Sequence, residues 1–134
     1  MEIRNLTPHP CVVLVEDPSG DLEGTTGTGP SANFSRYRKV AEIAPAGPVA
    51  RAAQREESVG SVPVDGTDIP VVKMTYGETV DLPEPEDGTM YFVSVLTAQA
   101  AAAHGRRTDD LLFSGKSVRN REGRIVGLLS FAQL

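Results

Sequence analysis

The strongest structural signal in this chain is the dipeptide Asp65-Gly66, which lies between two runs rich in valine and isoleucine. The sequence around it reads "VPVDGTDIPVVKMTYGETVDLP". Aspartate followed by glycine accepts the positive φ angles of a tight turn, and β-branched residues on both sides favour extended strands. The sequence therefore predicts a β-hairpin within residues 62–83.

Much of the remaining chain is also typical of short strands separated by proline and glycine. Residues 1–17 predict two strands. Residues 37–43 and 49–55 predict two more, joined by a Pro-Gly turn, although "RAAQREE" could equally form a short helix. Residues 17–35 are rich in Gly, Ser, Thr and Pro and lack periodicity, so we expect a flexible loop there.

Only one segment has a clear helical signal. The apolar run "TMYFVSV" leads directly into "LTAQAAAAH", in which alanine has the highest helix propensity. Ser94 or Thr97 is placed to cap the start of this helix, and Gly105 to end it. Beyond it, "NREGR" predicts the turn of a last hairpin with strands near 116–119 and 124–131.

Together these patterns predict an α+β fold of mainly antiparallel β-strands and hairpins, with one α-helix near residues 95–105. A length of 134 residues suits a single domain, residues 1–134. No apolar run is long enough to cross a membrane, and the N-terminus does not resemble a signal peptide. The single cysteine, Cys11, excludes an internal disulfide and a multi-cysteine metal site, so we expect a protein of a reducing cytoplasm.

The charges are distributed unevenly along the chain. The net charge of −5 argues against non-specific binding to DNA. Residues 56–87 carry nine acidic side chains against Lys73 alone, whereas residues 102–134 carry six basic side chains against three acidic ones. This asymmetry permits a local anion site on an acidic protein, and it is equally compatible with pairing of opposite charges inside the domain.

Catalytic constellations are scarce. His9 and His104 do not have the spacing of a metal-ligand pair, and the two sites suit a turn and a helix C-terminus respectively. Cys11 within "CVVLV" is typical of a buried small apolar residue. The carboxylates of "PEPED" and "TDD" lie in segments expected to be solvated loops. We therefore predict no catalytic residue, no metal ligand, no cofactor and no enzymatic activity.

Side chains that bind phosphate are more numerous in this chain than side chains suited to catalysis. The chain has ten arginines and three lysines, and the planar fork of arginine suits bidentate contact with phosphate. Arg106 and Arg107 directly follow the predicted helix, where two interpretations stay open. They form either a helix end that pairs with Asp109 or Asp110, or an anion-binding site. Tyr76, at a predicted strand end before a glycine, is a candidate stacking ring.

The pattern of motifs resembles a known family. It includes "NLTPHP", "VAR" at 49–51, "IPVVKMTYGE", "LPEPEDGTMYFVS", "RTDDLL" and "VRNREGRIVG". This pattern is similar to small proteins common in phages and prophages, and within them to the first-described Thoeris anti-defence proteins. Those proteins are sponges that sequester the glycocyclic ADP-ribose signal of bacterial TIR-domain defence without cleaving it.

This resemblance implies a site and an assembly. It implies ligand binding by Arg51, Tyr76 and Arg107, with Arg106 as a substitute for Arg107, in a pocket at a subunit interface. A second arginine of the family's pocket would fall near Ala103, where this chain departs from the pattern. The resemblance also implies a homo-oligomer, a dimer or a hexamer, that can bind cyclic oligonucleotides at a separate site.

Two other functions stay open from the residues. One is an enzyme that hydrolyses a cyclic nucleotide or ADP-ribose signal, with acidic residues of "PEPED" or "TDD" and a metal. The other is a phage structural or interaction protein with no small ligand.

Overall fold

The computed structural model describes all 134 residues and contains eleven strands and one helix. The elements are β1 (Glu2–Asn5), β2 (Cys11–Glu16), β3 (Leu22–Gly24), β4 (Ser35–Ile43), β5 (Arg51–Val64), β6 (Thr67–Val80), β7 (Thr89–Phe92), α1 (Val95–Ala103), β8 (Leu111–Ser114), β9 (Ser117–Arg119), β10 (Ile125–Leu128) and β11 (Phe131–Ala132). The prediction of a mostly β chain with one short helix is confirmed.

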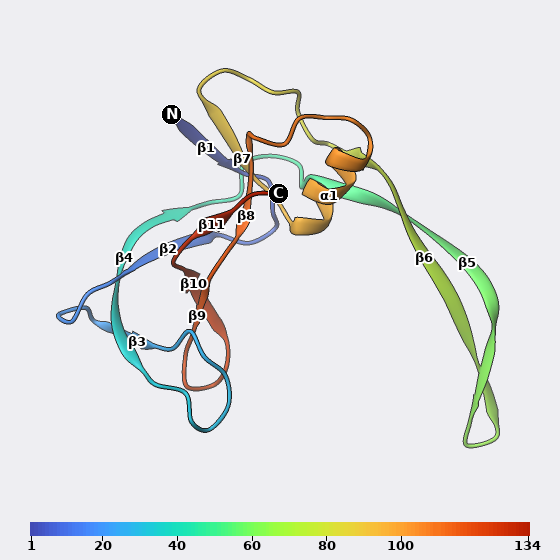
Figure 1. Ribbon diagram of the computed structural model, residues 1–134, viewed down its shortest axis with the longest axis horizontal. Helices are drawn as coiled ribbons and strands as arrows, with labels where there is room; N and C mark the ends of the chain where they lie inside the picture. Colours follow the sequence, from blue (N-terminus) through green and yellow to red (C-terminus); the bar gives the residue numbers. More distant parts are fainter.

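The strands form three sheets. A four-stranded sheet has the order β1-β7-β8-β11, and a five-stranded sheet has the order β3-β4-β2-β10-β9. These two sheets make the body of the molecule, and β5 and β6 form a two-stranded ribbon that projects from it (Figure 1). We call this ribbon the arm.

Five of the eight strand pairs are antiparallel and three are parallel, and the sequence patterns did not indicate the parallel ones. They are β1 with β7, β7 with β8, and β2 with β10. Parallel neighbours need a crossover connection, and α1 supplies it between β7 and β8. The alternation of apolar residues shows that a strand exists but does not show the direction of its partner.

Two local predictions also differ from the structure. Residues 17–35 are not wholly loop, because β3 lies within them and pairs with β4. The strands at 37–43 and 49–55 lie in β4 and β5, which belong to different sheets, so the Pro-Gly segment between them is not a hairpin turn. "RAAQREE" is strand in β5, not helix, because every residue of it except Ala53 pairs with β6.

The arm confirms the predicted hairpin and extends it toward the N-terminus. Asp65 and Gly66 both have positive φ, +48° and +82°, as a type I′ turn requires. Each strand has 14 residues, so the arm is about 45 Å long at roughly 3.3 Å per residue. Its ladder is irregular near Ala53 and Val59.

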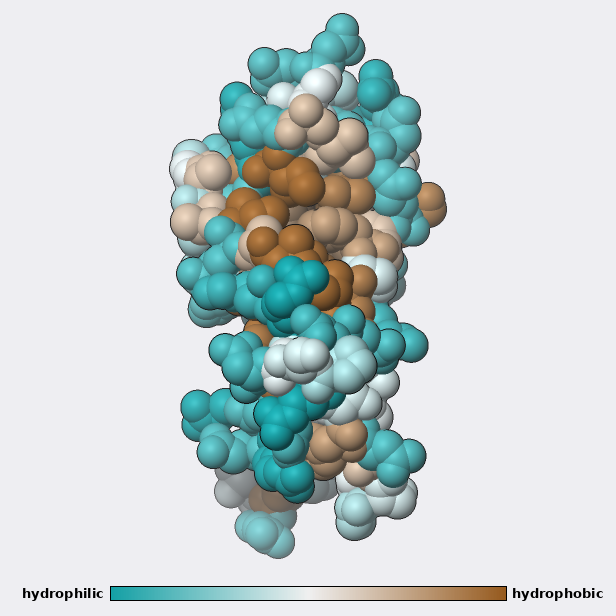
Figure 2. All heavy atoms as spheres, turned by 90° about the vertical axis from the view of Figure 1, so that its left-hand side faces the viewer, coloured by the Kyte–Doolittle hydropathy of each residue, from teal (hydrophilic) through white to brown (hydrophobic).

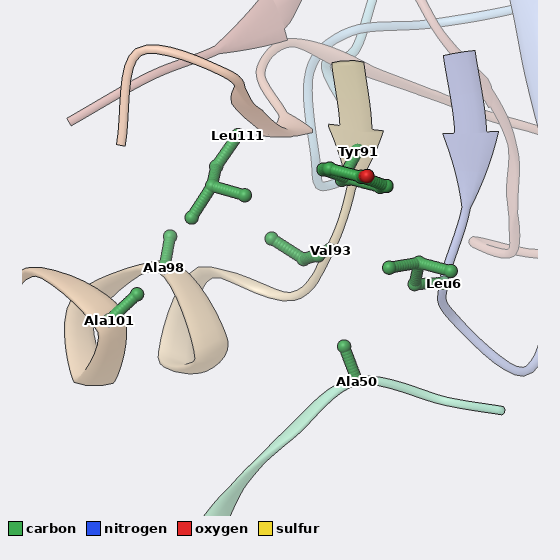
Figure 3. Packing of buried hydrophobic residues seen from close by; sticks show 7 residues of the cluster. All are labelled: Leu6, Ala50, Tyr91, Val93, Ala98, Ala101 and Leu111. Atoms are coloured by element: carbon green, nitrogen blue, oxygen red, sulfur yellow. The ribbon is translucent and has the colours of Figure 1, made fainter. Parts of the chain in front are cut away.

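The largest buried cluster lies where the arm joins the body. Figure 3 shows side chains of β7, α1 and the residues beside β1, β5 and β8 pointing toward one another. The cluster consists of Leu6, Ala50, Tyr91, Val93, Ala98, Ala101 and Leu111. Two alanines of α1 face it, so the small side chains allow the helix to pack closely. Thr97 Oγ1 donates to the carbonyl oxygen of Ala50 at 3.2 Å, which ties the helix to the first residue before the arm.

The helix has the predicted boundaries. Ser94 is its N-cap, since the backbone N–H of Thr97 donates to Ser94 Oγ at 3.2 Å. Gly105, with φ +82°, ends it, and the backbone N–H of Arg106 donates to the carbonyl of Ala101.

Removal of the cap should weaken the domain modestly. Ser94→Ala leaves the N–H of Thr97 without its acceptor and should lower the free energy of unfolding by about 1 kcal/mol. Urea denaturation measures this change. Ser94→Asp retains an acceptor at the helix N-terminus and should restore most of the lost stability; an equal loss in both variants would contradict the capping role.

Candidate functional site

Arg106 is held by the body of the protein. Its Nη1 and Nη2 donate to Asp110 Oδ1 and Oδ2 at 2.8 and 3.0 Å, a bidentate pair. The same nitrogens reach the carbonyl oxygens of Arg107 and Pro83, both at 2.8 Å. The Arg106 side chain is 14% exposed and that of Asp110 only 4%. This geometry fastens the loop after α1 to the acidic loop before β7.

Arg107 lies on the surface instead. Its Nε donates to Asp109 Oδ1 at 2.6 Å, and both side chains are well exposed. The hydrogen bond to Asp109 raises the pKa of Arg107, so the guanidinium is charged at every pH of interest. Nη1 and Nη2 of Arg107 make no hydrogen bond, and they remain free to meet an anion.

Arg51 and Tyr76 belong to the arm. Arg51 begins β5 opposite Val80, and Tyr76 on β6 is the partner of Gln54. Arg51 is exposed and forms no ion pair, and Tyr76 is 44% exposed. A register shift between Ala52 and Gln54 separates these two pairs, so strict alternation of the faces does not carry from one to the other.

None of the four predicted residues lines either of two hollows in the surface. Arg51 pairs with Val80 at the base of the arm, and Arg106 bonds the carbonyl of Pro83, three residues further along the chain. Arg106 and Arg107 follow the last turn of α1, whereas Ala50, the residue before Arg51, accepts a hydrogen bond from its first turn.

The larger hollow was not predicted from the sequence. It is an open groove of about 510 Å³ between the end of β7, β8 and the strands β2 and β10. Nine of its sixteen lining residues are hydrophobic, and none is Asp, Glu, Lys or Arg. Its polar groups are those of Thr7, His9, Ser94, Ser114 and Ser117. Cys11 also lines it, and burial raises the pKa of that thiol. Because strands distant in sequence form this groove, no local pattern marks it.

A smaller polar hollow of about 190 Å³ lies between the 25–34 segment and the last hairpin. The guanidinium of Arg121 lies 4.4 Å from the centre of the Phe34 ring and pairs with Glu23. Arg119 Nη1 donates to the carbonyl of Gly123 at 2.8 Å. Both arginines have partners in the protein, so they hold the 17–35 segment and the last turn in place.

The acidic residues do not gather around a common point. No group of three or more His, Cys, Asp and Glu side chains is placed to hold a metal ion. Two carboxylates of "TDD" are engaged by Arg106 and Arg107. No helix is long or apolar enough to cross a bilayer.

No family model, curated protein or solved structure matches this chain. The architecture of the chain is an α+β body with an exposed two-stranded arm. A function has to be inferred from the residues that this architecture presents to solvent.

Proposed function

We propose that this chain is a non-enzymatic, self-associating cytoplasmic protein that captures a cyclic ADP-ribose-type nucleotide and releases it unchanged. The observation that carries this proposal is the state of the side chains near the base of the arm. Arg51 has no ion-pair partner, and Tyr76 is 44% exposed to solvent. In a protein whose net charge is −5, unpaired guanidinium groups on an exposed ribbon favour an anionic ligand.

The chemistry of such a ligand matches these groups. A cyclic ADP-ribose isomer carries two phosphates and an adenine. Guanidinium forks of Arg51 and Arg107 bind phosphate oxygens, and the face of Tyr76 stacks on a base. Capture requires no general acid, base or metal.

A second subunit would complete the site. Arg51, Tyr76 and Arg107 are exposed, whereas Arg106 is largely buried against Asp110. Tight capture of a small polar ligand needs enclosure, which one chain of this size supplies best by self-association. On this proposal Arg51 and Tyr76 of one copy meet Arg107 of another, while Arg106 supports the loop that carries Arg107.

Substitutions at these positions should weaken nucleotide binding without unfolding the protein. Arg51→Ala and Arg107→Ala each remove charge-assisted hydrogen bonds of about 1.5–3 kcal/mol, which is roughly a ten- to hundred-fold weaker Kd. Tyr76→Ala should lose about 1–3 kcal/mol, whereas Tyr76→Phe, which keeps the ring face, should lose little. Titration calorimetry with cyclic ADP-ribose isomers measures each Kd.

Arg36→Ala is the matched control, since Arg36 is an exposed arginine of β4 without an ion pair and far from the arm. It should bind as the unsubstituted protein does. Full affinity in both Arg51→Ala and Arg107→Ala would place the site elsewhere. A hydrolysed product whose rate of appearance follows protein concentration would replace sequestration by an enzymatic function.

The exposed apolar residues of the arm favour a second candidate, a phage structural or interaction protein without a small ligand. Val62, Val64 and Ile69 are each about half exposed at its distal end. The absence of calorimetric heat with every nucleotide, together with stable self-association, would support this candidate.

A further inference from the structure

The end of the arm, residues 60–71, has one face rich in apolar side chains. Val59 and Val72, the next residues toward the body, are also exposed, at 58% and 41%. Along β6, Thr67, Ile69 and Val71 alternate to the same side, and their cross-strand partners are Val64, Val62 and Gly60. Val62, Val64, Ile69 and Val71 are between 39% and 53% exposed. We call these four side chains the tip patch. The other side of the same segment carries Ser61, Pro63, Asp68 and Pro70.

An isolated two-stranded ribbon is at best marginally stable in water. Each of these apolar side chains contributes stability only when it leaves water, and no other element of the chain covers the distal arm (Figure 1). The tip patch therefore needs a partner surface. Its own body cannot provide one, because the arm points away from it.

The apolar groove between β7, β8, β2 and β10 is a surface of matching character. Val95 and Ile125 at its edge are 42% and 57% exposed. Its volume of about 510 Å³ equals that of about seventeen water molecules at roughly 30 Å³ each, so the groove admits several valine-sized side chains.

The charges around the two surfaces are complementary. The turn of the arm carries Asp65 and Asp68 and no basic residue between 60 and 70. Two charged residues are direct sequence neighbours of residues that line the groove, and both are basic. Lys116 precedes Ser117, and Arg124 precedes Ile125. Neither basic side chain forms an ion pair. Figure 2 shows, in addition, that hydrophobic residues gather on the side of the body turned away from the arm.

We propose that the tip patch of one copy docks into the apolar groove of a second copy, with Asp65 in the turn of the arm facing Lys116 and Arg124. Such a contact joins two different surfaces, so it is heterologous and builds a closed ring or an open chain of copies. This inference deepens the self-association part of the proposed function and does not depend on the nucleotide.

Cross-linking between two differently labelled chains tests the contact. In a Cys11→Ala background, one chain carries Val64→Cys at the tip and the other carries Val95→Cys at the groove. Mixed at micromolar concentration with a short bismaleimide and no nucleotide, the two should give a covalent dimer. A mixture of Val64→Cys with Val40→Cys, an equally exposed position on β4, should not.

Each of the remaining outcomes overturns the docking of the tip patch in the groove. Val64→Cys chains that cross-link with one another at least as well as with Val95→Cys would show arm-to-arm pairing. Oligomers seen by light scattering without the Val64–Val95 cross-link would leave self-association standing but remove this interface. A monomer that cross-links at neither pair would remove both.

A charge exchange gives an independent readout that does not rely on cysteine. Lys116→Asp with Arg124→Asp should weaken self-association about ten-fold, as measured by analytical ultracentrifugation. Adding Asp65→Asn to that chain removes the repulsion and keeps a residue that accepts positive φ in the turn, so it should recover part of the association. An equal loss in both variants would contradict the docking of the tip on the groove.

Discussion

Arg106→Ala should destabilise the protein by about 3–5 kcal/mol, because it leaves the carboxylate of Asp110 buried without its partner. Asp110 is 3% exposed and accepts both hydrogen bonds of the fork. The substitution also frees the carbonyl of Pro83 from its donor. Urea denaturation followed by circular dichroism measures the change.

The neighbouring arginine is the control for this prediction. Arg107→Ala removes an exposed pair with Asp109, and its denaturation midpoint should stay within experimental error. The double variant Arg106→Met, Asp110→Leu replaces both buried charges and should recover much of the stability. A loss below about 1 kcal/mol for Arg106→Ala would show that solvent reaches and screens the pair.

The second large effect is expected at Asn5, where Asn5→Ala should lower the free energy of unfolding by about 3–5 kcal/mol. Asn5 is fully buried, and its Nδ2 donates to the carbonyls of His9 and Ile43 at 2.7 and 2.8 Å. Its Oδ1 accepts from the backbone N–H and the hydroxyl of Thr7 at 3.0 and 2.6 Å. Removal of the amide breaks these four hydrogen bonds together, and the Thr7 hydroxyl and the His9 carbonyl keep their mutual one at 3.1 Å.

Asn120→Ala is a matched substitution at the surface. Asn120 Oδ1 accepts from the backbone N–H groups of Glu122 and Arg124 in the last turn, where water can replace it. Its loss should stay near 1 kcal/mol. Thermal melts of the two variants give the comparison, and equal shifts in Tm would contradict the structural role assigned to Asn5.

The role of Asn5 also changes how "NLTPHP" is understood. In the sequence this stretch served only as one motif of a family resemblance. The structure shows a hydrogen-bond centre that joins β1, the turn before β2 and the end of β4. The fold therefore requires Asn5 of "NLTPHP" for these hydrogen bonds, whether or not the protein binds a ligand.

Local chemistry was enough to predict some parts of the fold. Asp65-Gly66 specified the turn of the arm, since few other dipeptides accept positive φ twice. Ser94 and Gly105 specified the ends of α1, because capping involves only neighbouring residues. In the last hairpin, "NREGR" predicted the turn between β9 and β10 for the same reason.

Tertiary contacts decided the rest. The direction of β7 relative to β8 depends on how α1 packs across the sheet, and alternation within a strand carries no information about it. Arg106 is held by Asp110 and by the carbonyl of Pro83, which lies 23 residues away in sequence, so no local pattern could show which of the two arginines is engaged. The groove depends on β2, β7, β8 and β10 meeting in space. The sequence by itself determined the turns, the helix ends and the supply of arginines, whereas only the packing of distant strands decided which arginine is buried and which surfaces await a partner.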